Sequence, residues 1–383
     1  MHYLDKRIQV ICDQLKKQCV LKSEPVGNLF CKKGTFYHPE EAHADEAAFS
    51  VFDSQTMRWY GADEHYWFYF DCELQPVPEG LIRQLHVSTQ YDGWDARNPQ
   101  FLVFVDGMPV QGLDTNHRDV RLNLTGKHRI DLQAYTGIEH SEFRLNCAWE
   151  EVDAEINGLY WDLQVPLQAF NRLDADSQSR LALERVLNDA INLLDMRTPY
   201  NRAYLNGGPA MPADMPVVPH NEAYMASIRE ARAYLKKHLY EDLAGHDEVI
   251  ATCIGHTHID VAWWWTVAQT REKVARSFST VLKLMEEYPG YKFMSSQPQL
   301  YAFLKERYPE LYEQIKHRVA EGRWEPEGGM WVEADCNLTS GESLVRQFIH
   351  GKKFFKDEFG VDNEILWLPD VFGYSGHLGC AGD

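Results

Sequence analysis

The sequence lacks any long hydrophobic run. No apolar stretch approaches the roughly 18 residues that a membrane-spanning helix requires. The N-terminal segment has charged residues at Asp5, Lys6 and Arg7 and again at Lys16 and Lys17, so it lacks the continuous apolar core of a secretory signal peptide. We therefore expect a protein that is neither inserted in a membrane nor exported.

Positive charge is also scarce. Lys and Arg number 38 against 57 Asp and Glu, which gives a formal net charge of −19. Binding to nucleic acid needs clustered basic side chains that release counterions from the phosphates, and the anionic inner face of a membrane repels an acidic protein. We therefore expect neither a nucleic-acid partner nor a membrane partner.

Closely spaced cysteine pairs are absent as well. The chain has 8 cysteines but no Cys-x-x-Cys pair. Without an export signal, such cysteines are expected to be free thiols in a reducing compartment, so the sequence predicts a cytoplasmic protein. Hydrophobic residues, in contrast, make up 44% of the chain and aromatic residues 13%, which is enough for sizeable cores and excludes wholesale disorder.

The N-terminal part of the chain predicts a helix followed by a β-rich domain. Residues 1–24 have apolar side chains at helical spacing, and residues 25–165 contain short runs rich in Val, Phe and Tyr between turn residues. Short strands at near-regular spacing are typical of an antiparallel β-sandwich, here of jelly-roll type. Tyr91, Trp94 and Trp161 are candidate platforms for sugar stacking in this module, although packing is the favoured role.

The pattern then changes to helices and finally to alternating strands and helices. Residues 166–246 are predicted to be helical around a Pro-rich linker at 199–219. Residues 247–383 alternate helices with short apolar strands, which are expected at 248–254, 291–296, 323–328 and 364–368. This alternation predicts a parallel sheet or a β/α-barrel-like domain, in which the chemistry takes place at the C-terminal ends of the strands.

The first candidate site directly follows a predicted strand. His256, His258 and Asp260 lie at alternate positions, so an imidazole nitrogen and a carboxylate oxygen can be directed to one point. That mixture of donors suits zinc in a catalytic site that keeps a position open for substrate. The pattern alone fits several classes of metal-dependent hydrolase.

The second candidate site also follows a predicted strand. Asp370 lies between a proline and the segment Val-Phe-Gly-Tyr-Ser at 371–375. A carboxylate in this place is suited to act as a nucleophile or as a further metal ligand, whereas taken alone it fits a turn or a helix cap equally well. The two sites together favour the functional interpretation.

Three motifs in this order resemble glycoside hydrolase family 38, the class II α-mannosidases. They are His-Thr-His-Ile-Asp-Val-Ala-Trp at 256–263, Gly-Gly-Met-Trp-Val-Glu-Ala-Asp at 328–335 and Leu-Pro-Asp-Val-Phe-Gly-Tyr-Ser at 368–375. The β-rich module and the helical region before them resemble those of the cytosolic and vacuolar branch of that family. The family consists of retaining glycosidases with a catalytic zinc ion.

The resemblance implies a role for several residues of these motifs. His258 and Asp260 match zinc ligands, and Asp370 matches the carboxylate that is both a zinc ligand and the nucleophile. His256 has no ligand role in the family pattern, so support of the ligands from behind, or simple packing, is expected of it.

The resemblance also implies residues that contact the sugar. Trp263 matches the aromatic residue that lines the sugar subsite, while Trp264 and Trp265 are expected in the core. Asp335 is expected near the sugar hydroxyls, with a structural turn as a nearly equal alternative.

Some parts of the family pattern have no counterpart in this sequence. The fourth zinc ligand of the family, a His, and its general acid, an Asp, both lie downstream of the nucleophile motif, and the sequence ends soon after Asp370. We therefore expect residues 247–383 to form a truncated catalytic domain, and the activity of this chain by itself stays open.

The function that follows from the resemblance is a zinc-dependent retaining α-mannosidase. Its partner would be a mannose-containing oligosaccharide, from which it hydrolyses terminal α-mannosyl linkages, and a homo-oligomer is compatible with the full-length form. One alternative is a catalytically inactive remnant that at most binds carbohydrate. A second alternative is a metal-dependent amidohydrolase or phosphoesterase, which also has a His-x-His pair after a strand but needs further ligands at later strand ends.

Overall fold

The computed structural model describes residues 4–90, 98–196, 220–244, 250–376 and 378. The Pro-rich segment predicted as a linker lies outside these ranges, and so do Tyr91 and Trp94. None of the helices within these ranges has both the length and the apolar composition needed to cross a membrane.

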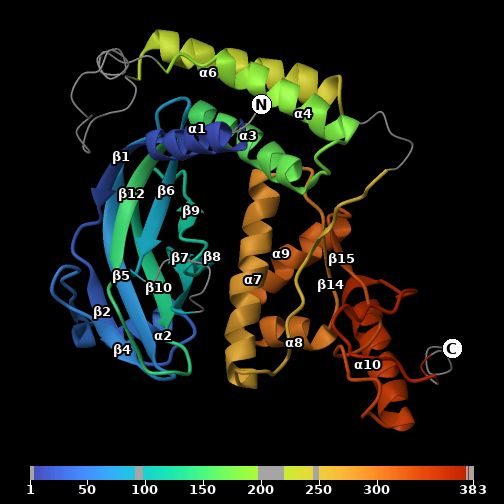
Figure 1. Cartoon of the computed structure of the whole chain (residues 1–383). Helices are drawn as coiled ribbons and strands as arrows, with labels where there is room; N and C mark the ends of the chain where they lie inside the picture. The colour runs from blue at the N-terminus through green and yellow to red at the C-terminus, as the bar shows by residue number, and fades with distance from the viewer. Residues whose placement is uncertain (1–3, 91–97, 197–219, 245–249, 377, 379–383) are drawn as a thin grey trace.

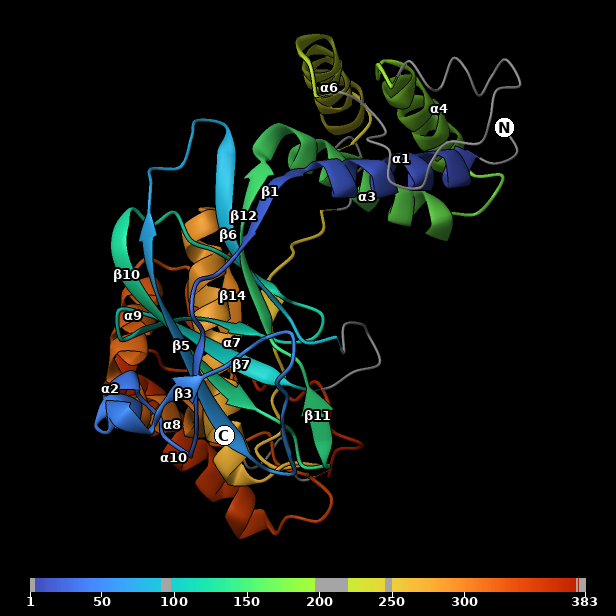
Figure 2. The ribbon, with the colours of Figure 1, turned by 90° about the vertical axis from the view of Figure 1, so that its left-hand side faces the viewer.

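Helices from both sides of the β-rich region form one layer. α1 (Leu4–Gln18), α3 (Ala154–Arg172), α4 (Gln178–Asn192) and α6 (Glu222–Leu235), which continues as the π-helical turn Lys236–Glu241, share one hydrophobic core. The apolar residues predicted for the N-terminal helix are buried in it, namely Leu4, Ile8, Ile11 and Leu15. Figures 1 and 2 show this layer across one end of the sheets.

The β-rich region consists of two main antiparallel sheets and one short strand pair. The smaller sheet has the order β1 (Val20–Pro25), β12 (Asn146–Asp153), β6 (Leu81–Ser88) and β9 (Asp119–Arg121). The larger one has the order β3 (Ser50–Val51), β2 (Phe30–Lys33), β5 (His65–Leu74), β10 (Gly126–Tyr135), β7 (Gln100–Val105) and β8 (Met108–Leu113). β4 (Trp59–Gly61) pairs with β11 (Ser141–Phe143), and two short helical turns lie at Pro39–His43 and Glu46–Ala48.

One hydrophobic core joins the two larger sheets. It receives Leu85, Val87 and Val120 from the smaller sheet, and Phe68 and Ile130 are among the residues that it receives from the larger one. Two antiparallel sheets that pack face to face around a common core form a β-sandwich, as the near-regular spacing of short strands in the sequence predicts.

The β-rich region ends earlier than the sequence pattern predicts. Residues 154–165 were expected within it, but they form the first part of α3. Asp153 caps this helix, because its carboxylate accepts the backbone N–H groups of Glu155 and Ile156. The helical spacing of the buried residues on α3, from Ile156 to Phe170, is the signal for this helix, and Trp161 is a half-exposed residue on it.

The C-terminal part contains a small parallel sheet covered by helices. Its strands are β13 (Gly255–His256), β14 (Phe293–Ser295) and β15 (Trp324–Pro326), in that order. The helices between and after them are α7 (Val267–Glu287), α8 (Pro298–Arg307), α9 (Pro309–Ala320) and α10 (Gly341–Phe359). A core around the fully buried Trp324, Phe278 and Tyr301 holds this part together.

Two of the predicted strands require correction. Residues 250–254 form no strand, Ile250 is largely exposed, and the pairing is limited to the two residues of β13. The strand expected at 364–368 is reduced to a single parallel bridge between Gly328 and Leu366. The parallel sheet of the prediction is present with three strands, and within the described ranges they do not close into a barrel.

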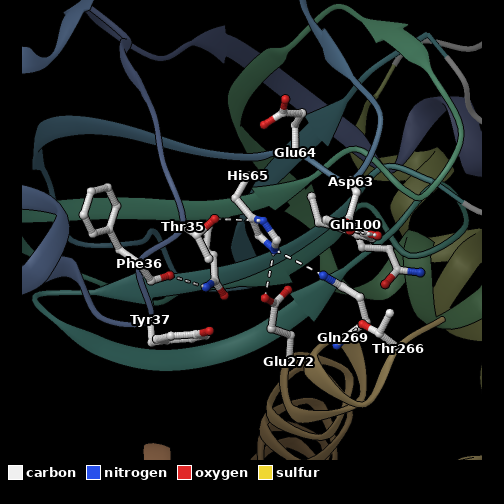
Figure 3. A network of polar contacts seen from close by, with 12 residues as sticks. Thr35, Phe36, Tyr37, Asp63, Glu64, His65, Gln100, Thr266, Gln269 and Glu272 are labelled. Carbon is white, nitrogen blue, oxygen red and sulfur yellow. Dashed lines mark hydrogen bonds and ion pairs between the residues drawn. The ribbon is translucent and has the colours of Figure 1, made fainter. Parts of the chain in front are cut away.

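The sandwich and the C-terminal part meet along α7. Gly112 of β8 lies so close to this helix that an added Cβ atom would be 2.7 Å from the Cβ atom of Arg276. Figure 3 shows buried polar contacts beside it, in which the His65 imidazole is 2.8 Å from the Glu272 carboxylate and 3.3 Å from the Gln269 side-chain amide. One helical turn further along α7, Arg276 donates a hydrogen bond of 2.6 Å to Gln100. The two parts are therefore joined by polar and charged side chains that are largely buried.

Candidate metal centre

Local structure after β13 directs the first motif toward the C-terminal edge of the small sheet. His258 and Asp260 follow this strand directly, and the buried Ile259 between them packs into the core of the C-terminal part. Alternation of this kind turns the side chains on either side of a buried residue away from the core. His258 and Asp260 therefore lie on one side of the segment, where their polar atoms can converge.

Asp370 comes to the same place from a turn far along the chain. The turn follows the bridge at Leu366, and the Tyr374 hydroxyl donates a hydrogen bond of 3.0 Å to the Leu368 carbonyl across it. Leu368 is buried in a small core beside α10, whereas Asp370 is exposed. The turn thus anchors its apolar residue and presents its carboxylate.

His258, Asp260 and Asp370 form a three-residue cluster. Their potential ligand atoms all lie within 4.8 Å of one another. The His258 Nε2 atom is 3.3 Å from an Asp260 oxygen and 3.8 Å from an Asp370 oxygen. The structure therefore brings together all three residues that the sequence suggests as metal ligands.

The geometry of this cluster fits a zinc ion. With metal–ligand bonds of about 2.0–2.2 Å, neighbouring ligand atoms of a tetrahedral zinc site are about 3.4 Å apart. The separations of 3.3 and 3.8 Å around His258 Nε2 are close to that value. One imidazole and two carboxylates are also a donor set that zinc accepts, and three protein ligands leave a coordination position open.

Glu333 orients His258 from behind, and the sequence analysis did not identify it. Its carboxylate is 2.5 Å from His258 Nδ1, and its side chain is only 2% exposed. A hydrogen bond from Nδ1–H to a carboxylate leaves Nε2 as the atom that faces Asp260 and Asp370. Burial lowers the pKa of His258, but the nearby carboxylates of Glu333 and Asp260 outweigh this effect and raise it.

Two further residues hold Glu333 in place. The Ser296 hydroxyl donates to the second Glu333 oxygen, and the Glu333 backbone N–H donates to the Gln297 side chain at 3.2 Å. Gln297 also donates to the Ile259 carbonyl at 3.0 Å, and it has a left-handed backbone conformation with φ of 63°. Such a conformation is costly for a residue other than glycine, and here it joins the segments that carry His258 and Glu333.

The neighbours of Glu333 indicate that it is buried, but not which residue it contacts. It is an acidic residue between Trp331, Val332 and Ala334, and a carboxylate within an apolar segment requires a partner once it is buried. Asp335, from the same motif, was the carboxylate predicted to have a role in the site. A single sequence does not show which of the two carboxylates faces His258.

His256 has both ring nitrogens occupied by protein groups. Nδ1 donates to the Met294 carbonyl at 3.0 Å, and Nε2 accepts a hydrogen bond of 3.2 Å from the Trp367 indole. It is therefore not directed at the metal cluster. Instead it joins β13 to β14 and to the segment that leads to Asp370, and this contact agrees with a supporting role.

The residues expected to contact sugar differ in their surroundings. Trp263 is 60% exposed and follows Asp260 closely, but Trp264 is equally exposed, so the expectation that Trp264 lies in the core is wrong. Trp265 is half-buried, with Lys273 above its ring at 4.1 Å. The Asp335 carboxylate accepts the backbone N–H groups of Asn337 and Leu338, an arrangement typical of a structural turn.

A conservative change at Glu333 tests its role behind His258. Replacing it by Gln removes the charge that holds the His258 Nδ1–H, and loss of such an outer contact typically lowers metal affinity about 10–100-fold. We therefore expect Glu333→Gln to weaken zinc binding by this factor in a competition titration with a chelator. Glu325→Gln, at an exposed position of β15, is the matched control. Equal zinc affinities for the two variants would contradict the assignment.

Comparisons with known proteins agree with this geometry. Residues 248–379 match the family described as glycosyl hydrolases family 38 N-terminal domain. α-Mannosidase G of Dictyostelium discoideum is 48% identical over 143 residues, which cover 37% of this chain and 13% of that protein. α-Mannosidase 2C1 of Homo sapiens is 31% identical over 365 residues, covering 89% of this chain and 31% of that protein.

A third relative matches more than half of the chain. The α-mannosidase of Saccharomyces cerevisiae is 32% identical over 246 residues, which cover 61% of this chain and 20% of that protein. The chain therefore belongs to glycosyl hydrolase family 38, as the three motifs indicate. It spans about a third or less of the length of these relatives.

Proposed function

We propose that this chain provides the zinc-binding and nucleophilic part of a retaining α-mannosidase. The observation that carries the proposal is the convergence of His258, Asp260 and Asp370 in a chain of this family. His258 and Asp260 would hold the ion, and Asp370 would be both a ligand and the nucleophile. The substrate class would be oligosaccharides with terminal α-mannosyl residues, and the cytoplasm the site of action.

The exposure of Asp370 suits a nucleophile. Its side chain is 55% exposed, whereas the carboxylate of Glu333 is buried against His258. In a retaining glycosidase the nucleophilic carboxylate must reach the anomeric carbon of the sugar and form a covalent glycosyl-enzyme ester, which water then hydrolyses. An exposed carboxylate can do so, whereas one that is buried against a histidine cannot.

The other residues of the site would bind and orient the sugar. A zinc ion held by His258, Asp260 and Asp370 would supply a Lewis acid for the sugar hydroxyls. Trp263, three residues after Asp260 in the sequence, has an exposed aromatic side chain on which a sugar ring could stack. Asp335 is exposed, and one of its carboxylate oxygens accepts the two backbone N–H groups of its turn. The second oxygen would serve a sugar hydroxyl.

Hydrolysis of an activated aryl α-mannoside tests the proposal. A phenol that leaves without protonation does not need the general acid, which typically contributes about 10²–10⁴-fold and which the family resemblance places outside this sequence. We expect zinc-loaded chain to release the phenol, and we expect this release to stop after removal of zinc with a chelator. Natural oligosaccharides should be cleaved far more slowly.

The matched variants are Asp370→Asn and Asp357→Asn. Asp357 is a surface residue of α10 in an ion pair with Lys353, so its change should leave phenol release unaltered. Asp370→Asn should abolish it. Zinc-dependent release that survives in Asp370→Asn would contradict the assignment of the nucleophile, and zinc binding without any release would favour the inactive remnant. Hydrolysis of amides or phosphoesters instead would favour the second alternative.

A further inference from the structure

A second cluster of metal-binding residues lies on the sandwich, away from the candidate metal centre. His86 on β6, Asp119 on β9 and Glu150 on β12 have potential ligand atoms that all lie within 4.8 Å of one another. The three strands are neighbours in the smaller sheet. We propose that these residues form a binding site for a divalent transition-metal ion, with zinc as the ion of choice.

The register of the sheet places the three side chains on one face. His86 is directly opposite Asp119, and Glu150 is opposite Gln84, two residues from His86 on the same strand. Leu85 and Val87 are buried in the sandwich core, so the alternate residues of β6 face outward. Direct and diagonal neighbours on one face of a sheet are within reach of long side chains, so folding of the sheet alone assembles the triad.

The contacts around Glu150 aim its carboxylate at the other two residues. Gln84 donates to one Glu150 oxygen at 2.9 Å, and the Ser23 hydroxyl on β1 donates to the other at 3.4 Å. His86 Nδ1 is 2.6 Å from an Asp119 oxygen. An ion pair accounts for the contact between His86 and Asp119. It does not account for the position of Glu150, a third potential ligand that Gln84 and Ser23 hold beside them.

The donor set and the surroundings suit an ion of this class. One imidazole and two carboxylates form the same set as in the candidate metal centre, and such mixed nitrogen and oxygen ligands favour zinc or a related transition metal over calcium. Arg121, on the same face, is paired with Glu287 of α7 at 3.1 Å. Because the triad borders a cavity of about 1060 Å³, an ion can enter from solvent and keep water ligands.

Metal stoichiometry distinguishes this site from the candidate metal centre. The probe is cobalt(II) or zinc(II) added to the whole chain, with bound metal measured after equilibrium dialysis. Wild-type chain should bind two ions. The double variant His258→Ala/Asp260→Ala should retain one, and the further change His86→Gln should remove it. Loss of a direct ligand should weaken this binding at least about 100-fold, because even an outer contact typically contributes about 10–100-fold.

The chain offers a matched control within the same cavity. His117 is paired with Asp114 at 3.1 Å and also borders the cavity, but the two belong to no three-residue metal cluster in the described ranges. In the double-variant background, His117→Gln should leave the remaining ion bound. Glu150→Gln, which keeps the shape of the side chain, should remove it, and it replaces His86→Gln as the test if that variant fails to fold. A double variant that binds no ion, or an ion that survives both His86→Gln and Glu150→Gln, would overturn the proposal. Because these measurements do not use catalysis, their outcome is independent of the proposed mannosidase function.

Discussion

Replacing His258 by Ala is expected to abolish zinc retention at the candidate metal centre. His258 is the imidazole ligand of the cluster, and its Nε2 atom is the point that both carboxylates approach, at 3.3 and 3.8 Å. Without it, Asp260 and Asp370 would be two carboxylates that repel each other, and Glu333 would be a buried charge without its main partner. Zinc affinity should fall by more than the roughly 10–100-fold expected for an outer contact.

Zinc bound at the candidate metal centre is best measured in a chain whose second cluster, His86, Asp119 and Glu150, has been disrupted. In a His86→Gln background, bound zinc is determined after dialysis against a chelator for His258→Ala and for His256→Ala. The second variant is the matched control, because the His256 ring nitrogens bind Met294 and Trp367 rather than the cluster. We expect no zinc in the first variant and weakened binding in the second. One zinc ion retained by His258→Ala would show that the cluster is not the binding site.

Replacing Glu272 by Ala is expected to cause a large loss of stability. Glu272 is 3% exposed and contacts both His65, at 2.8 Å, and Arg276, at 3.5 Å. Burial lowers the pKa of Arg276, and the Glu272 carboxylate is the main group that counteracts this effect. Removing one partner of a buried ion pair leaves an uncompensated charge and typically costs about 3–5 kcal/mol. The free energy of unfolding in urea measures the loss.

A second glutamate on the same helix provides the control. Glu286 is paired with Lys283 at 2.9 Å, and its side chain is 52% exposed. Exposed pairs of this kind contribute about 0–1 kcal/mol, so Glu286→Ala should change the free energy of unfolding by no more than that. Equal losses for the two variants would show that the junction in Figure 3 does not depend on its buried charges.

The residues of the metal cluster could be predicted because each lies after a short apolar run that is typical of a strand. Short apolar runs precede both motifs, and polar residues after parallel strands gather at one edge of the sheet. The two motifs still meet at this edge although the strands are shorter than predicted. β13 has two residues, and Leu366 forms a single bridge. The direction of the chain at these points, rather than the length of the strands, brings His258 and Asp370 together.

The supporting residues could not be predicted in the same way. Glu333 and Gln297 act through contacts with His258 and Ile259, which are distant in sequence, and no local pattern encodes such contacts. The exposure of Trp264 was also missed, because three consecutive tryptophans suggest a core, whereas only packing shows which ring is covered. The helix that begins at Ala154 was missed for a different reason, since its apolar residues continue a β-rich segment without a break in composition.

The sequence by itself determined the family, the order of the main structural regions and the three candidate zinc ligands. These follow from motifs and periodicities whose residues are close together in the sequence, so each can be recognised without knowledge of the fold. Tertiary structure alone decided which carboxylate orients His258, how buried charges join the sandwich to α7, and that His86, Asp119 and Glu150 meet on one face. Each of these contacts joins residues far apart in the chain, so it depends on strand register and helix packing, which no short stretch of sequence reveals by itself.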